Sequence, residues 1–258
     1  MKKVLALILT LLMCVSVMAS CSDSSSDIKS IEKNGKIVVG ITDYAPMDFR
    51  GDDGEWTGFD AEFAALFAKE LGVEVEFIEI NWDNKFLELE NKSIDCIWNG
   101  MTITDEVKLN TSCSDPYVRN AQVVVMSADV AANYKSVDDL KDLTFAVEKG
   151  SAGEKALEDC GIAADKVTAV KDQASALLEV NSNAVDACVI DLTMANAMAG
   201  KGNYASLAKS IELTSEEYGV GFRKESDLTA KFNEFLKKVK EDGTLQELAD
   251  KYELTLAD

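Results

Sequence analysis

Residues 73–100, VEVEFIEINWDNKFLELENKSIDCIWNG, predict a strand, a helix and a second strand in succession. Polar and apolar residues alternate at the start of this stretch, as they do in a strand, and a helical pattern follows. The last part is an apolar strand that ends in a glycine turn. Together with an apolar strand at 36–41 and a helix at 59–72, this stretch gives the order βαβαβ. That order predicts an α/β fold.

A second series of strands and helices lies between residues 121 and 200. Apolar strand segments alternate there with helical segments, so two α/β lobes are expected. A further strand is predicted at 216–224, and a helical hairpin at 226–254 is interrupted by Gly243. Neither of these last segments obviously belongs to the second lobe.

The first 21 residues are typical of an export signal. Lys2 and Lys3 precede an apolar run that ends in MASC, residues 18–21, which resembles a lipobox. We therefore expect cleavage before Cys21, a lipid anchor on its thiol, and a location on the extracytoplasmic face of the cell membrane. The serine-rich residues that follow predict a flexible tether.

Composition excludes several classes of function. The formal net charge of −20 argues against a nucleic-acid partner. The chain contains no histidine, which removes the commonest general base and metal ligand. Four cysteines follow Cys21 without a paired CxxC spacing, so neither a zinc site nor a redox motif is predicted, and their disulfide pairing stays open. We expect no metal and no organic cofactor.

The order of the motifs resembles the extracytoplasmic solute-binding proteins, family 3, of polar amino-acid ABC importers, which have the type II periplasmic-binding-protein fold. The resemblance extends from about residue 36 to residue 252. The motifs that carry it are VGITDYAPMDF, GEWTGFDAEFAALFAKELG, NWDNKFLELENKSIDCIWNGMTIT, SDPY, SVDDLKDLTFAVEKGS, VDACVID, EEYGVGFRK and EDGTLQELADKY.

This resemblance implies two Rossmann-like lobes joined by two hinge strands, with the ligand enclosed between them. A monomer would present the closed form to an ABC permease and its ATPase. The expected divisions are residues 1–20 for the signal peptide, 21–35 for the lipidated tether, 36–120 plus 216–258 for lobe 1, and 121–215 for lobe 2.

The resemblance also implies a set of ligand contacts. Two aromatic residues would enclose the ligand side chain, four residues would receive its α-ammonium group, and a helix start would hold its carboxylate through backbone N–H groups. In that order these residues are Tyr44 and Trp82; Asn99, Gly100, Thr102 and Asp191; and Gly150 and Ser151.

Val107 departs from the family pattern, in which an arginine follows the TIT motif and grips the ligand carboxylate. A carboxylate enclosed without a cation is unfavourable, so the missing charge needs a substitute. Arg119 is a candidate for that cation, and a solvent-exposed hinge residue is the other interpretation of it. Alternatively, the ligand has no α-carboxylate, or only helix amides hold it.

Three acids, Asp43, Glu148 and Asp191, are expected to face one cleft. Together with the missing arginine they favour a cationic ligand, such as a basic amino acid or a related amine. The predicted function is capture of this ligand for an ABC importer, without enzymatic activity. Two alternatives stay open: a cyclohexadienyl-type dehydratase on the same fold, and a lipoprotein that senses the ligand for a receptor.

Overall fold

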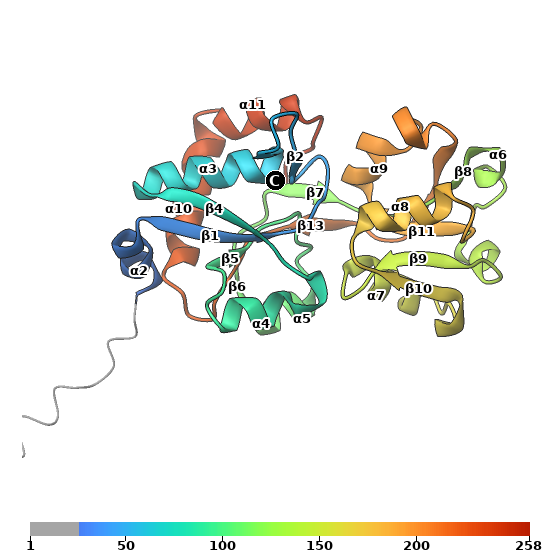
Figure 1. The fold of residues 1–258 in the computed structure, drawn as a ribbon, viewed down its shortest axis with the longest axis horizontal. Helices are drawn as coiled ribbons and strands as arrows, with labels where there is room; N and C mark the ends of the chain where they lie inside the picture. The colour runs from blue at the N-terminus through green and yellow to red at the C-terminus, as the bar shows by residue number, and fades with distance from the viewer. Residues whose placement is uncertain (1–25) are drawn as a thin grey trace, which may run out of the picture.

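The computed structural model describes residues 26–258. Figure 1 shows two α/β lobes side by side, each with its own sheet. The predicted signal peptide, Cys21 and the first residues of the predicted tether lie outside the described residues. None of the helices in the described part of the chain is both long and apolar enough to cross a membrane.

The first sheet has the strand order β4-β1-β5-β14-β6. β1 (Lys36–Ile41) pairs in parallel with β4 (Glu74–Glu79) and with β5 (Cys96–Ile97). β14 (Gly221–Phe222) then joins this sheet antiparallel to β5 and to β6 (Ser112–Cys113). The chain therefore returns to the first lobe after it has built the second.

Helices cover the first sheet on both faces (Figure 1). The prediction for the helix at 59–72 is confirmed, because Phe59, Phe63 and Phe67 are buried on one face of it. Phe63 packs edge-on against Trp98, with ring centroids 5.1 Å apart, within an aromatic core. The helices of this lobe are α3 (Phe59–Leu71), α4 (Lys85–Glu90), α5 (Asp105–Asn110), α10 (Leu228–Glu241) and α11 (Thr244–Lys251).

The second sheet has the strand order β10-β9-β11-β8-β12. Three of its strands are parallel, whereas β8 and β12 run antiparallel to their neighbours. The strands are β8 (Gln122–Ser127), β9 (Phe145–Glu148), β10 (Val167–Val170), β11 (Ala187–Asp191) and β12 (Leu207–Glu212). The helices are α6 (Ala128–Ala131), α7 (Ala152–Asp159), α8 (Gln173–Asn181) and α9 (Leu192–Met198).

Two short strands connect the lobes. β7 (Val118–Asn120) pairs antiparallel with β13 (Glu216–Tyr218), in the register Glu216 opposite Asn120. The predicted fold class, two lobes joined by two hinge strands, is confirmed. The remaining elements are β2 (Phe49–Arg50), β3 (Trp56–Thr57) and the 3-10 helices Trp82–Asn84, Val137–Leu140, Ala164–Lys166 and Gly202–Tyr204.

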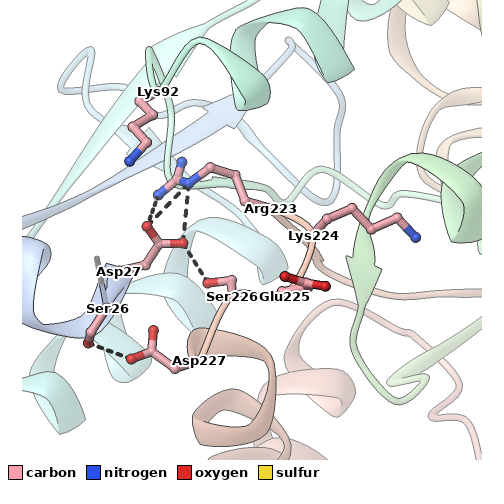
Figure 2. Close-up of a pocket in the computed structure, with 8 residues that line it drawn as sticks. All are labelled: Ser26, Asp27, Lys92, Arg223, Lys224, Glu225, Ser226 and Asp227. Carbon is pink, nitrogen blue, oxygen red and sulfur yellow. Dashed lines mark hydrogen bonds and ion pairs between the residues drawn. The ribbon is translucent and has the colours of Figure 1, made fainter. Parts of the chain in front are cut away.

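The structure corrects the predicted tether, because residues from Asp27 onward fold as helix α2 (Asp27–Asn34). Ser26 caps this helix, and Ile31 is buried against the first lobe. The ion pair of Asp27 with Arg223, which Figure 2 shows, explains why the helix packs there. Arg223 Nη2 lies 3.0 Å from a carboxylate oxygen of Asp27 and 3.0 Å from one of Asp95. Although burial acts to raise it, hydrogen bonds from Arg223 and Ser226 hold the pKa of Asp27 below its usual value.

A pair of buried acids lies beneath the turn that follows β5. Asp60 accepts hydrogen bonds from the backbone N–H of Gly100 and from Tyr117 Oη, the latter at 2.8 Å. Asp48 is fully buried, and neither of its carboxyl oxygens has a hydrogen-bond partner among the described residues. Burial raises the pKa of Asp60 to about 7, and burial and the neighbouring Asp60 raise the pKa of Asp48 well above its usual value.

Asp48→Asn is expected to stabilise the fold at neutral and alkaline pH. A carboxyl group with a raised pKa keeps a proton in the folded chain that the unfolded chain has released, so its destabilising effect grows as the pH rises above about 4. An asparagine removes this effect, and the gain should exceed about 1 kcal/mol at pH 8. Urea unfolding at pH 5 and pH 8 measures it.

The Asp52→Asn variant, at an exposed position on the other side of β2, is the matched control for the change of charge. Its stability should follow that of the wild type at both pH values. A gain for Asp48→Asn that is equal at pH 5 and pH 8 would contradict the buried-acid explanation.

Candidate functional site

A cavity of about 550 Å³ lies between the two lobes. Trp82, Lys85, Thr102 and Val107 line it from the first lobe. From the second lobe it is lined by the start of α7, and Glu216 lines it from hinge strand β13. Residues far apart in the sequence therefore line one cavity.

One wall of the cavity is apolar, and a lysine lies beside it. Trp82 and Val107 are almost fully buried. Lys85 Nζ lies 5.0 Å from the centroid of the Trp82 ring, and its residue is only 4% exposed. Burial lowers the pKa of Lys85, against the opposing effect of nearby carboxylates such as Glu106 and Glu148.

A second wall of the cavity, formed at Glu216, is acidic. Thr102 Oγ1, Asn120 Nδ2 and Gln122 Nε2 donate hydrogen bonds to Glu216 Oε1 at 2.8, 2.7 and 2.8 Å. The same two amide groups also donate to Asp191 Oδ1, from Gln122 at 2.6 Å. Two carboxyl groups thus share one set of donors, and Glu216 is the one that lines the cavity.

The proximity of Glu216 affects the pKa of Asp191, which does not line the cavity itself. Burial, followed by the charge of Glu216, raises the pKa of Asp191 to about 7. Glu148 is also buried, and its Oε1 has no hydrogen-bond partner among the described residues. Burial and the charge of Asp191 raise the pKa of Glu148 well above its usual value. A cation close to these acids would favour their ionised forms.

The lobes touch directly around the cavity. Lys85 Nζ of the first lobe donates to the carbonyl oxygen of Gly150 in the second at 2.8 Å. A side chain on Gly150 would meet Asp83 Cα at 3.0 Å, which is closer than nearly all real contacts of this kind. The hydroxyl of Tyr44 lies in hydrogen-bonding distance of both Thr193 on α9 and Tyr218.

Four of the predicted site residues, Trp82, Thr102, Gly150 and Ser151, line the cavity. Ser151 caps α7, as its sequence predicts, and accepts a hydrogen bond from Glu154 N at 3.2 Å. In a capping box the side chain of Glu154 would accept a hydrogen bond from the N–H of Ser151. Here it accepts from the N–H of Gly150, one residue earlier.

Other predicted residues support this space without lining it. Asn99 binds Thr42 through both atoms of its side-chain amide, at 2.9 and 2.7 Å. Gly100 has φ +56°, and a side chain there would lie 2.5 Å from the ring of Tyr44. Tyr44, Glu148 and Asp191 are buried behind the cavity. Asn99 and Gly100 therefore fix the turn before Thr102.

Arg119 and Asp43 do not line the cavity. The guanidinium group of Arg119 pairs with Asp258 and is half exposed. Strand β7 explains the correction: its residues alternate between faces, so Val118 and Asn120 point inward and Arg119 points to solvent. Asp43 is exposed, and burial of part of its side chain and the nearby Asp172 raise its pKa.

The sequence matches the bacterial extracellular solute-binding proteins, family 3, over residues 37–255. The chain belongs to this family. It is 30% identical over 227 residues to the L-cystine-binding protein TcyJ of Escherichia coli K12, covering 87% of this chain and 85% of the relative. It is 30% identical over 251 residues to the arginine-binding extracellular protein ArtP of Bacillus subtilis, covering 95% and 96%.

Solved structures agree with this assignment. A mutant of the arginine-binding protein of T. maritima is 34% identical, covers 88% of this chain and 98% of its own, and has a TM-score of 0.82. A histidine-bound protein of an ABC uptake transporter from Streptococcus pneumoniae is 29% identical, with 89% and 96% coverage and a TM-score of 0.81. An ancestral amino acid-binding precursor of cyclohexadienyl dehydratase is 34% identical, with 88% and 99% coverage and a TM-score of 0.81.

Sequence reasoning about this family 3 protein missed Lys85, Asn120, Gln122 and Glu216. Lys85 is the one basic residue in its predicted helical segment, and Gln122 is a polar residue at the start of an apolar strand. These positions of Lys85 and Gln122 in the sequence could have indicated polar side chains that are buried with a partner. Glu216 and Glu217 cannot be distinguished without the register of β13, which turns Glu216 toward the cavity and leaves Glu217 exposed.

Glu216→Gln is expected to lower the pKa of Asp191, because it removes the neighbouring negative charge and leaves the burial unchanged. The value should fall below 7 and stay above that of an exposed aspartate. Carboxyl ¹³C chemical shifts followed from pH 4 to pH 9 measure it. Glu217→Gln, at the exposed neighbouring position, is the control, and an equal shift in both variants would contradict the shared-donor geometry.

Proposed function

We propose that this solute-binding protein is the lipid-anchored receptor of an ABC importer and captures a basic amino acid or a related amine between its lobes. The observation that carries the proposal is the acidic wall, where Glu216 and Asp191 share the amide donors of Asn120 and Gln122. An ammonium group offers only donors, so it requires acceptors and a nearby negative charge when it leaves water.

The proposed contacts follow from the two walls. The ligand ammonium would lie against Glu216 and Thr102, with the charge of Asp191 behind them. The ring of Trp82 would cover the aliphatic or cationic part of the ligand. The positive end of α7, where Gly150, Ser151 and Ala152 line the cavity, would face an anionic part of the ligand.

The relatives support the same class of ligand. ArtP and the T. maritima protein are named for arginine, and the S. pneumoniae structure holds histidine. TcyJ is named for cystine, so the family alone does not fix the ligand. The acidic wall and the valine at position 107 are the features of this chain that favour a cation.

Isothermal titration of the unrefolded protein, freed of copurified ligand, tests this proposal. We expect binding of at least one of L-arginine, L-lysine and L-ornithine, and much weaker binding of L-glutamate, because glutamate would add a negative charge beside Glu216. Mass spectrometry of the small molecule that copurifies identifies the natural ligand. Tight binding of glutamate without affinity for the basic amino acids would reject the cationic class.

Asp191→Ala serves as the site variant in these titrations. Loss of a buried charge near the ammonium should weaken binding on the order of 10- to 100-fold. Asp129→Ala, an exposed acid on the same lobe, is the matched control and should bind as the wild type does. Unaltered affinity of the Asp191 variant would remove this residue from the proposed site.

The proposal also includes the division of the chain into lobes and a lipid anchor, which lies in the part of the chain before Ser26. We propose lobe 1 as residues 36–120 plus 216–258, lobe 2 as 121–215, and lipidation of Cys21 after cleavage of residues 1–20. Cys21→Ser should move the protein from the membrane fraction to the soluble fraction of a bacterial host, whereas Cys160→Ser should not. A Cys21 variant that stays in the membrane fraction would contradict the anchor.

A further inference from the structure

Lys85 is an unusual residue for the wall of an acidic protein's cavity. It begins helix α4 directly after the 3-10 helix that carries Trp82, and this turn directs its side chain between the lobes. The whole residue is 4% exposed. A lysine is rarely buried to this degree unless its charge has a partner.

The hydrogen-bond acceptors of Lys85 are two carbonyl oxygens. Its Nζ donates to Trp82 O at 3.2 Å and to Gly150 O at 2.8 Å. Among residues 26–258, no carboxylate oxygen lies within the 4.0 Å that defines an ion pair with this group. An ammonium group has three N–H donors, so one donor is left for another partner. The rings of Trp82 and Phe86, with centroids 5.0 and 4.7 Å from Nζ, lie close to its charge but do not neutralise it.

The other lysine of the cavity differs in this respect. Lys155, on α7, forms an ion pair with Asp159 one turn later and is well exposed. Lys149, next to the cavity, pairs with Asp83 across the lobes at 2.8 Å. Lys85 is therefore the buried cation of this cavity whose charge no described carboxylate neutralises directly.

The geometry points to Lys85 as the residue that binds the carboxylate of the ligand. The inference rests on the proposed function, and it narrows the ligand to amino acids as opposed to amines that lack a carboxylate. Lys85 and Glu216 line the same cavity without forming an ion pair with each other. In this arrangement a zwitterionic ligand would place its ammonium at Glu216 and its carboxylate at Lys85.

This assignment also accounts for Val107. The residue is buried in the apolar wall beside Trp82 and lines the same cavity, so it offers no charge to an anion. A carboxylate enclosed there requires a cation, and Lys85 is already desolvated and held in place by two carbonyl groups. The ion pair would form with little further loss of side-chain freedom.

A purely structural role for Lys85 predicts a different result. Its hydrogen bond to Gly150 connects the lobes, so removal of the lysine could hinder closure. Closure affects every ligand, whether or not the ligand has a carboxylate. Only a direct contact with the carboxylate changes the preference for an amino acid over its decarboxylated amine.

The experiment compares two such pairs, L-arginine with agmatine and L-lysine with cadaverine, by isothermal titration of the full protein. In the wild type, the amino acid of at least one pair should bind about tenfold or more tightly than its amine. Lys85→Met should abolish this preference, mainly by weakening the amino acid. Lys85→Arg should retain it, because a guanidinium also binds a carboxylate.

Lys155→Met is the matched control, since it removes the other lysine that lines the cavity and should keep the preference. A thermal unfolding curve establishes that each variant is folded, and Lys85→Gln provides the same comparison if Lys85→Met does not fold cooperatively.

Three results would overturn the inference. Equal weakening of amino acid and amine in Lys85→Met would make Lys85 a contact between lobes only. If Lys85→Met bound the amino acid and the amine as the wild type does, Lys85 would not bind the carboxylate, and the backbone N–H groups of α7 would be the remaining candidates. A wild type that binds the amine as well as the amino acid would show that no carboxylate is recognised. Failure of the proposed function has a separate signature, in which the wild type binds none of these four compounds and no L-ornithine, and the inference then falls with it.

Discussion

The shared hydrogen bonds of Asn120 and Gln122 are the constraint on which the site depends. Two side-chain amides hold Asp191 of the second lobe and Glu216 of the hinge close together. Burial of Asp191, followed by the negative charge of Glu216 beside it, explains the raised pKa of Asp191. Two carboxyl groups therefore lie close together where the lobes meet. A cation that binds beside them would reduce the repulsion between their negative charges.

The hinge strands make this arrangement possible. β7 and β13 pair with Glu216 opposite Asn120, and Gln122 follows at the start of β8. The same segments that connect the lobes therefore carry the donors and one of the acids. The network thereby connects Thr102 of the first lobe, through Glu216 of the hinge, to Gln122 and Asp191 on the side of the second lobe.

Much of the fold and part of the candidate site could be predicted from the sequence. The segments at 36–41, 59–72 and 73–100 predicted the strands and helices of the first lobe, because their apolar residues recur with the periods of these elements. Trp82, Thr102, Gly150 and Ser151 were predicted at the site and line the cavity. Two expectations differ from the structure for separate reasons. Arg119 lies outside the cavity because β7 turns it to solvent, and part of the predicted tether is a helix because Asp27 pairs with Arg223, which is distant in the sequence.

The sequence alone determined the class of fold, the family and the absence of a charged residue at position 107, because these depend on local pattern and residue type. Only the tertiary structure decided which polar side chains face the cavity. Strand register turns Glu216 inward and Arg119 outward, and the approach of the lobes brings Lys85 to Gly150. Such choices depend on pairings between residues separated by dozens of positions, and no local pattern in the chain encodes them.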